Sequence, residues 1–112
     1  MGKETIGEFE EIVMLTVAVL NEDAYGISIK DDIESRLNRK VSVGAMRTAL
    51  KRLEKKGFLD SAFGEATAVR GGKRKRYFKV TPYGQKVLTQ VMHTRKSLWE
   101  AIPNMSLEFK FS

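Results

Sequence analysis

The spacing of apolar residues changes at Gly57, and this change restricts the possible folds of the chain more than any other feature of the sequence. Before Gly57, apolar residues recur every three or four positions, as on the buried face of a helix. After it, the spacing shifts towards two, in runs at 58–63 and 77–81 that are rich in aromatic and β-branched residues,. The pattern therefore predicts helices first and a two-stranded hairpin after them.

The helix predicted over 42–57 has the clearest separation of an apolar face from a polar face, and we call it the divided helix. Ser42 can cap its amino end through its hydroxyl, and Gly57 suits a left-handed conformation at its carboxyl end. At about 100° per residue, one arc is apolar and the opposite arc carries cations and small residues without any acid. The apolar arc comprises Met46, Ala49, Leu50 and Leu53, and the opposite arc comprises Gly44, Arg47, Thr48, Lys51, Arg52 and Lys55.

Small residues at the amino end of this helix, Gly44, Ala45 and Thr48, favour close approach to another surface. A helix of this kind fits the major groove of DNA, where Arg and Lys reach phosphates and guanine edges. A solvated surface helix is the alternative, because Lys and Arg are also common on such helices.

Two further helices are predicted before the divided helix. The first is expected to begin near Thr5, which has capping-box spacing to Glu8, and to be apolar on nearly all sides. The second is expected from about Gly26 to Leu37 and leads through a short basic turn into the divided helix. Helix, helix, short turn and helix is the layout of a helix-turn-helix.

Two pairs of adjacent acids, Glu10-Glu11 and Asp31-Asp32, lie on these two helices. Neighbouring residues point about 100° apart, so neither pair converges as an acid–base pair would, and we expect both to lie on solvated faces. His93 is the only histidine, cysteine is absent, and no nucleophile has a base at a suitable spacing. We therefore expect no enzyme, no metal site and no cofactor.

The hairpin is predicted to turn at Gly71-Gly72. From Arg70 to Lys79 the chain has six basic residues and no acid. Because this run directly precedes a strand and shares the charge of the divided helix, we expect it to contact phosphates; a solvated loop is the alternative. Tyr25 is either a phosphate donor near a helix end or a packing residue. The predicted nucleic-acid contacts are Tyr25, Ser42, Gly44, Ala45, Arg47, Thr48, Lys51, Arg52, Arg70, Lys73, Arg74, Lys75 and Arg76.

A last helix is predicted from Thr81, with Pro82 in its first turn, to about Ala101, ahead of Pro103. Its apolar stripe spans about five turns. We expect the preceding helices and hairpin to close a core by themselves, so this stripe implies pairing with the same helix of a second subunit. The predicted dimer contacts are Val87, Leu88, Val91, Met92, Leu98, Trp99 and Ile102.

Trp99 has two interpretations. As part of that stripe it would anchor the subunit interface, as Trp often does. Its flat ring would alternatively serve as a platform for a small aromatic effector between the subunits. The tail at 104–112 alternates apolar and polar residues and is either a short strand or a segment that lies on the partner subunit.

Charge indicates the kind of partner. The 112 residues carry 20 Lys and Arg against 14 Asp and Glu, a net charge of +6, which favours a polyanion, nucleic acid before membrane. No apolar run approaches the roughly 20 residues of a membrane span, and the first residues do not read as a signal peptide. We expect a cytoplasmic protein without a membrane partner.

Four segments of the chain, in order, resemble the PadR-like family of transcriptional regulators. GEFEEIVML at 7–15 resembles the opening helix, and DAYGISI at 23–29 resembles the start of the second helix. VSVGAMRTALKRLEKKG at 41–57 resembles the recognition helix. RGGKRKRYFKVTPYG at 70–84 resembles the wing and the entry to the last helix.

The resemblance implies an α+β, mainly α fold. A winged helix-turn-helix of three helices and a two-stranded wing would occupy 1–81, a long dimerisation helix 82–103 and a tail 104–112. It also implies a homodimeric, sequence-specific regulator of double-stranded DNA, usually a repressor, with each recognition helix in a major groove of a palindromic operator. Each wing would lie on phosphates or in the minor groove.

The chain departs from the family at Arg47, where the family usually has Tyr; Arg at this position would read guanine or reach the backbone. Two other functions remain open. One is a winged helix that docks on an acidic protein partner, since a fold does not fix a function. The other, weaker one is RNA binding, which the absence of an exposed aromatic array disfavours.

Overall fold

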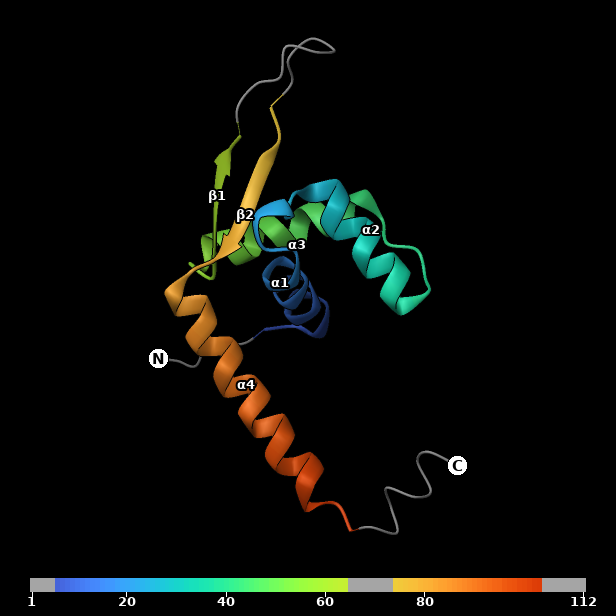
Figure 1. Ribbon diagram of the computed structural model, residues 1–112, viewed down its shortest axis with the longest axis vertical. Coiled ribbons are helices and arrows are strands. Elements are labelled where there is room, and N and C mark those ends of the chain that lie inside the picture. Colours follow the sequence, from blue (N-terminus) through green and yellow to red (C-terminus); the bar gives the residue numbers. More distant parts are fainter. Residues whose placement is uncertain (1–5, 65–73, 104–112) are drawn as a thin grey trace.

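The computed structural model describes residues 6–64 and 74–103, which form a helical body with a two-stranded hairpin and one long projecting helix (Figure 1). No helix in these ranges is both long enough and apolar enough to cross a membrane. The elements in chain order are α1 (Glu8–Leu20), the 3₁₀ helix η1 (Asn21–Asp23), α2 (Gly26–Leu37), α3 (Val43–Lys55), β1 (Leu59–Phe63), β2 (Arg76–Val80) and α4 (Pro82–Ala101).

The helix boundaries largely follow local chemistry. The predicted bounds of α2 and α4 are confirmed. Helix α1 begins at Glu8, later than predicted, because Gly7 is the capping residue and its N–H lies 3.5 Å from a carboxylate oxygen of Glu10. Thr5, the expected start, lies outside the described residues.

Both predicted caps of α3 are present. The hydroxyl of Ser42 accepts a hydrogen bond from the backbone N–H of Ala45 at 3.0 Å. At the other end Gly57 has a φ of +83°. There the N–H of Phe58 donates to the carbonyl of Leu53, and the N–H of Gly57 donates to that of Glu54. These two bonds form a Schellman motif, which ends the helix and turns the chain into β1.

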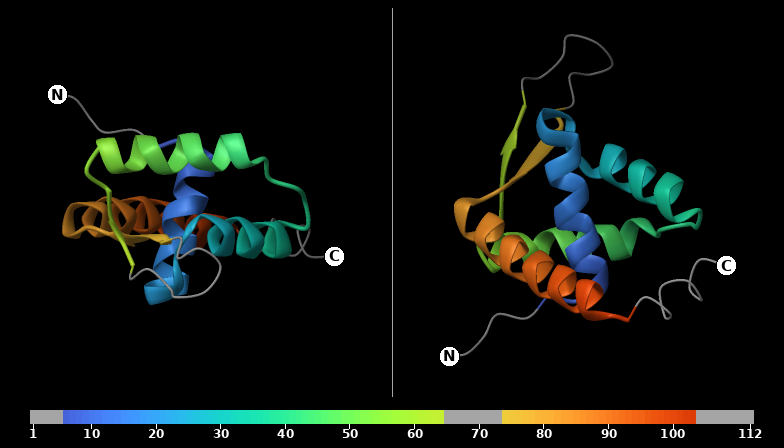
Figure 2. Two further views of the ribbon diagram at one scale, coloured as in Figure 1. Left: turned by 90° about the horizontal axis from the view of Figure 1, so that it is seen from above. Right: turned by 60° about the horizontal axis from the view of Figure 1, so that its bottom comes forward.

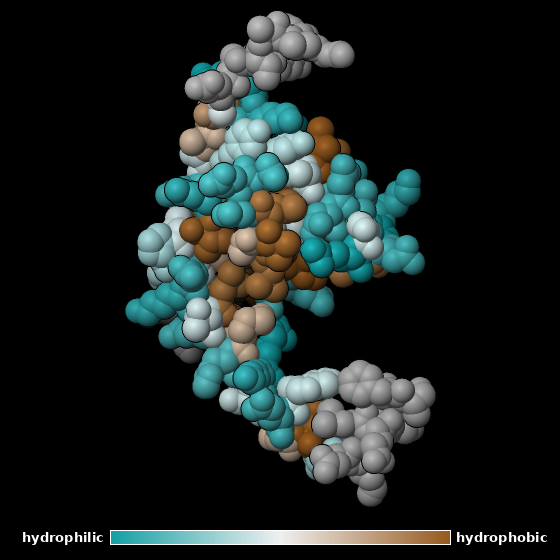
Figure 3. Space-filling model, viewed as in Figure 1, coloured by the Kyte–Doolittle hydropathy of each residue, from teal (hydrophilic) through white to brown (hydrophobic). Residues whose placement is uncertain are grey.

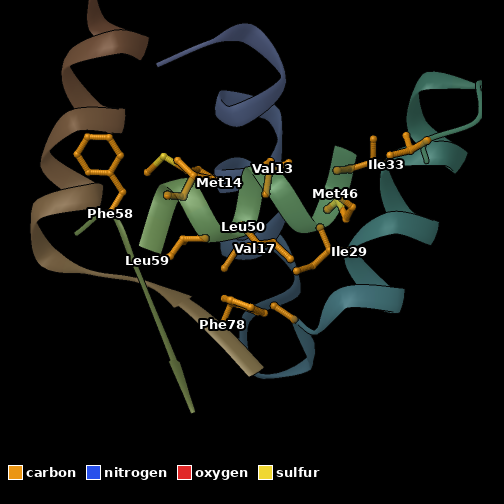
Figure 4. Packing of buried hydrophobic residues seen from close by; sticks show 14 of the residues in the cluster. Val13, Met14, Val17, Ile29, Ile33, Met46, Leu50, Phe58, Leu59 and Phe78 are labelled. Atoms are coloured by element: carbon orange, nitrogen blue, oxygen red, sulfur yellow. The ribbon is translucent and has the colours of Figure 1, made fainter. Parts of the chain in front are cut away.

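Helix α1 lies in the middle of the body and contacts α2, α3, α4 and β2. Its burial on several sides confirms the prediction from its nearly all-round apolar pattern. Buried side chains of α1, α2, α3 and the two strands lie together in one cluster (Figure 4). Members of this core are Val13, Met14 and Val17 of α1, Ile29 and Ile33 of α2, Met46, Ala49, Leu50 and Leu53 of α3, and Phe58, Leu59, Phe78 and Leu88.

The hairpin is antiparallel, with register pairs from Leu59↔Val80 to Phe63↔Arg76. It is fastened to the start of α2, because the N–H of Phe78 donates to the carbonyl of Ala24 at 2.8 Å. The wing therefore has a fixed base beside α2 and α3. Its predicted tip at Gly71-Gly72 lies outside the described residues.

The beginning of α4 is tightly joined to the body. The hydroxyl of Thr81 accepts from the N–H of Gly84 at 2.9 Å and donates to the carbonyl of Gly57 at 2.6 Å, which confirms Thr81 as the cap. Leu88 is only 8% exposed and belongs to the chain's own core. The expectation that the core closes without the last helix is therefore wrong, since α1 and the hairpin leave one side open for Leu88.

Candidate nucleic-acid interface

The front of α3 is exposed, as the division of its faces predicted. Gly44, Arg47, Thr48 and Lys51 all face solvent, whereas the apolar arc is buried. A Cβ added at Gly44 would meet no heavy atom within 4 Å. The amino-terminal half of α3 thus presents a narrow, unobstructed and cationic surface.

A groove with a volume of about 520 Å³ runs between α3, the beginning of α2 and the base of the wing. Cations of α3 and of the wing base line it together, so the two basic elements predicted from the sequence lie side by side. The predicted contacts Arg70 and Lys73 lie outside the described residues. The lining residues are Tyr25, Gly26, Ile27, Lys30, Val43, Met46, Arg47, Leu50, Lys51, Glu54, Lys75, Arg76 and Phe78.

Among the described residues that line this groove, Glu54 is the one acid, and it connects α3 to the wing. The Nε of Arg76 donates to the hydroxyl of Ser61 at 2.9 Å, and that hydroxyl donates to a carboxylate oxygen of Glu54 at 2.6 Å. The guanidinium of Arg76 also lies 3.5 Å from the same carboxylate. Arg76 therefore ties β2 to α3. Its contact with nucleic acid stays a prediction, and the sequence carried no signal for this three-residue link.

Aromatic rings support the other cations at the wing base. The Nζ of Lys75 lies 4.2 Å from the ring centroid of Tyr25, which packs edge-on against Tyr77 at 5.5 Å. The guanidinium of Arg74 lies 5.3 Å from the ring centroid of Phe63, and its Nε donates to a backbone carbonyl of the hairpin. Such cation–π contacts hold charged groups in place without neutralising them. The ring of Tyr25 packs against Tyr77 and Lys75. A contact of its hydroxyl with phosphate stays a prediction.

Sequence reasoning missed two exposed apolar residues on this surface. Ile27 at the start of α2 is 67% exposed and Val43 at the start of α3 is 58% exposed, and both line the groove. The sequence signal that could have found them is an aliphatic residue in the first turn of each of these two helices.

The prediction that Glu10 and Glu11 lie on a solvated face is wrong. Both are buried, at 9% and 8% exposure. Because α1 is covered on several sides, adjacent carboxylates that point about 100° apart meet different elements. Glu10 lies 3.2 Å from the Nζ of Lys56, whereas Glu11 accepts two hydrogen bonds from Arg95 of α4.

The apolar residues of α4 that were predicted to form the dimer contact have two different environments in the structure. Leu88 serves the chain's own core, whereas Leu98 is 66% exposed and Trp99 42% exposed. Apolar side chains also gather in the middle of the face seen in Figure 3, over α1 and the beginning of α4. Val19 of α1 is 60% exposed. His93 is exposed, as predicted, beside Met92 in a shallow groove of α4.

A helix-turn-helix whose third helix shares a basic groove with a β-hairpin defines the winged-helix class of DNA-binding domains. A model of the PadR-like family of transcriptional regulators matches residues 14–90. The chain belongs to this family, and it is a DNA-binding transcriptional regulator.

Solved structures of PadR-like proteins share this fold. One from Bacteroides fragilis is 26% identical, covers 82% of this chain and 84% of its own, and gives a TM-score of 0.67. One from Eggerthella lenta is 25% identical, covers 83% and 80%, and gives 0.62. An uncharacterized protein of Lysinibacillus sphaericus is 28% identical over 77% of this chain and 76% of its own length.

Proposed function

We propose that this chain acts as a homodimeric repressor on a two-fold symmetric operator, with α3 in the major groove and the wing on phosphates or in the minor groove. The observation that carries the proposal is the groove in which the cations of α3 and of the wing base lie together. Two such surfaces about 34–36 Å apart would match successive major grooves of B-form DNA.

The contacts proposed for α3 follow from its exposed front. Gly44 and Ala45 leave room for the backbone of α3 to approach the base edges, while Arg47 and Lys51 reach beyond it. Arg47 is exposed on α3, and an Arg in the major groove can bond both acceptors of a guanine, which discriminates bases by about 1–3 kcal/mol. We therefore assign Arg47 to sequence reading.

The wing base is proposed to contact phosphates. Arg74 and Lys75 are exposed and are held over aromatic rings, so their charge remains available to an anion. Neutralising phosphates releases counterions from DNA, and binding should therefore weaken steeply with salt.

The proposed dimer uses α4 and the apolar face over α1. Exposed Leu98 and Trp99 on α4, together with Val19 on α1, supply apolar area that the single chain leaves in water. In this arrangement 1–81 forms the DNA-binding unit and 82–103 the dimerisation helix, whose beginning also completes the chain's own core. A small aromatic effector stacked on Trp99 is part of the same proposal.

Selection of bound duplexes from a random pool tests the proposal directly. A two-fold symmetric motif is the expected result, and no binding to any duplex at low salt would refute it. Arg47→Ala should relax preference at one base position, whereas Arg74→Ala should weaken all duplexes alike and lower the salt slope by about 1. Arg36→Ala, at the far end of α2 and paired with Asp32, is the matched control and should change neither.

A second function is an interaction with an acidic, amphipathic protein segment. The exposed Ile27 and Val43 in the groove favour it, because phosphates make no use of an aliphatic surface. Capture of a protein partner by a chain that binds no duplex would support this function over the first.

A further inference from the structure

Within the described residues, the buried side chains of helix α4 lie at its beginning. Thr81 bonds to Gly57, Gly84 lies against the backbone of Phe58, and Leu88 is buried in the core. Past Leu88 the side chains of α4 are half-buried or exposed. A helix fastened over its first two turns is free to change direction unless a later contact restrains it.

Arg95 supplies that later contact. Its Nε donates to one carboxylate oxygen of Glu11 at 3.0 Å, and its Nη2 donates to the other at 2.8 Å. The site is about 10 Å further along the helix than Leu88, at 1.5 Å per residue. Figure 2 shows the second half of α4 passing the beginning of α1, where Glu11 lies.

This pair joins an exposed guanidinium to a buried carboxylate, because the side chain of Arg95 is 61% exposed. The side chain of Glu11 is only 11% exposed, and both of its oxygens are used by one planar guanidinium, which fixes direction as well as distance. The hydrogen bond with Glu11 raises the pKa of Arg95 above its ordinary value.

The neighbouring acid ties the same turn of α1 to the recognition helix. Glu10 lies 3.2 Å from Lys56, just after α3, and 3.9 Å from Arg52 within α3. Adjacent carboxylates thus hold the end of α3 on one side of α1 and α4 on the other. The direction of α4 and the position of α3 are therefore both fixed relative to the same turn of α1.

We propose that Glu11 and Arg95 are positioning residues that set the direction of α4, and through it the spacing of operator half-sites that the dimer accepts. This inference rests on the proposed dimer, in which two α4 helices join two winged-helix units. A 20-residue helix is about 30 Å long, so a tilt of 10° displaces its far end by about 5 Å. One base-pair step is about 3.4 Å; the tilt would therefore change the spacing by a base pair or more.

The test uses the full-length protein and a set of duplexes in which two selected half-sites are separated by every spacer length over one helical turn. Arg95→Gln and Glu11→Gln are compared with Arg36→Gln. The control removes the same side chain from a 2.7 Å contact with Asp32, but both partners of that contact lie on α2. Binding to a single half-site, dimer mass in solution and thermal unfolding are measured alongside.

Both test variants should accept spacers at least one base pair from the wild-type optimum, with the preference for the best spacer reduced tenfold or more. Binding to one half-site should stay within about twofold of wild type, because neither Glu11 nor Arg95 lines the groove between α3 and the wing base,. The double variant should resemble either single variant, since both remove one interaction. The control should keep the wild-type spacer preference.

Wild-type spacer preference in both folded, dimeric variants would overturn the inference and leave the proposed function intact. An equal loss on every spacer and on the single half-site would also overturn it, because that result describes a damaged domain. A wild-type protein that binds no half-site at all would instead refute the proposed function.

Discussion

Gly84→Ala tests how closely α4 approaches the rest of the body. A Cβ at this position would lie 2.2 Å from the carbonyl oxygen of Phe58, 3.0 Å from its carbonyl carbon and 3.0 Å from a methyl of Val80. Two of these three atoms are backbone and cannot rotate away. They belong to the turn that joins α3 to β1, so α4 itself has to move.

The size of the effect follows from that distance. Ordinary contact begins near 3.4 Å, so the helix would withdraw by about 1 Å and lift Leu88 from its place in the core. Overpacking of this kind typically costs about 1–3 kcal/mol. The gain of up to about 1 kcal/mol that Ala usually brings to a helix offsets only part of this cost, which leaves a net loss of about 1–2 kcal/mol.

Urea unfolding at one fixed protein concentration measures the change, and the fixed concentration matters because a dimer is stabilised by mass action. We expect the midpoint to fall by about 0.5–1 M, since a net loss of about 1–2 kcal/mol is divided by roughly 2 kcal/mol per molar urea. Gly44→Ala is the matched control, since its Cβ meets nothing within 4 Å and should leave the midpoint unchanged or slightly raised. If Gly84→Ala is as stable as the control, the close approach of α4 is refuted.

Three further expectations use other contacts. Ser42→Ala removes the cap of α3 and should lower the free energy of unfolding by about 1 kcal/mol, measured by urea unfolding; an unchanged midpoint would mean that the 3.0 Å bond from Ala45 contributes nothing. The backbone N–H of Val41 lowers the pKa of Glu34 below its ordinary 4.5, so the stability that Glu34 contributes is complete above pH 4.5 and is lost as pH falls through the lower folded value. Glu34→Gln should therefore flatten the loss of stability on acidification, and a curve parallel to wild type would contradict this. Gly44→Ala, although folded, should bind duplex DNA at least tenfold more weakly in an anisotropy titration because its methyl group holds α3 away from the bases; equal affinity would remove Gly44 from the proposed interface.

Much of the fold was predictable because it depends on interactions between residues that are close in the sequence. A hydroxyl or proline at the start of a helix, and a glycine at its end, act on backbone groups within four residues. Ser42, Gly57 and Thr81 were therefore assigned correctly, and the two faces of α3 followed from its period alone. Alternation of apolar residues likewise located both strands to within a residue or two.

The prediction was incomplete where a residue's partner is far away in sequence. Glu10 and Glu11 look like members of a solvated face, and nothing near them indicates Lys56 or Arg95. The sequence likewise gives no indication of the hydrogen bonds that link Glu54 through Ser61 to Arg76. A stripe of apolar residues on α4 does not reveal that Leu88 is used within the chain while Leu98 is left exposed.

The sequence alone thus determined the kinds and order of the elements, their caps and the cationic front of α3, because these depend on neighbours along the chain. The tertiary structure decided which acids are buried, where α4 points and which cations of the wing base face the groove. These depend on how several elements cover α1, and burial is a property of that packing rather than of any one segment.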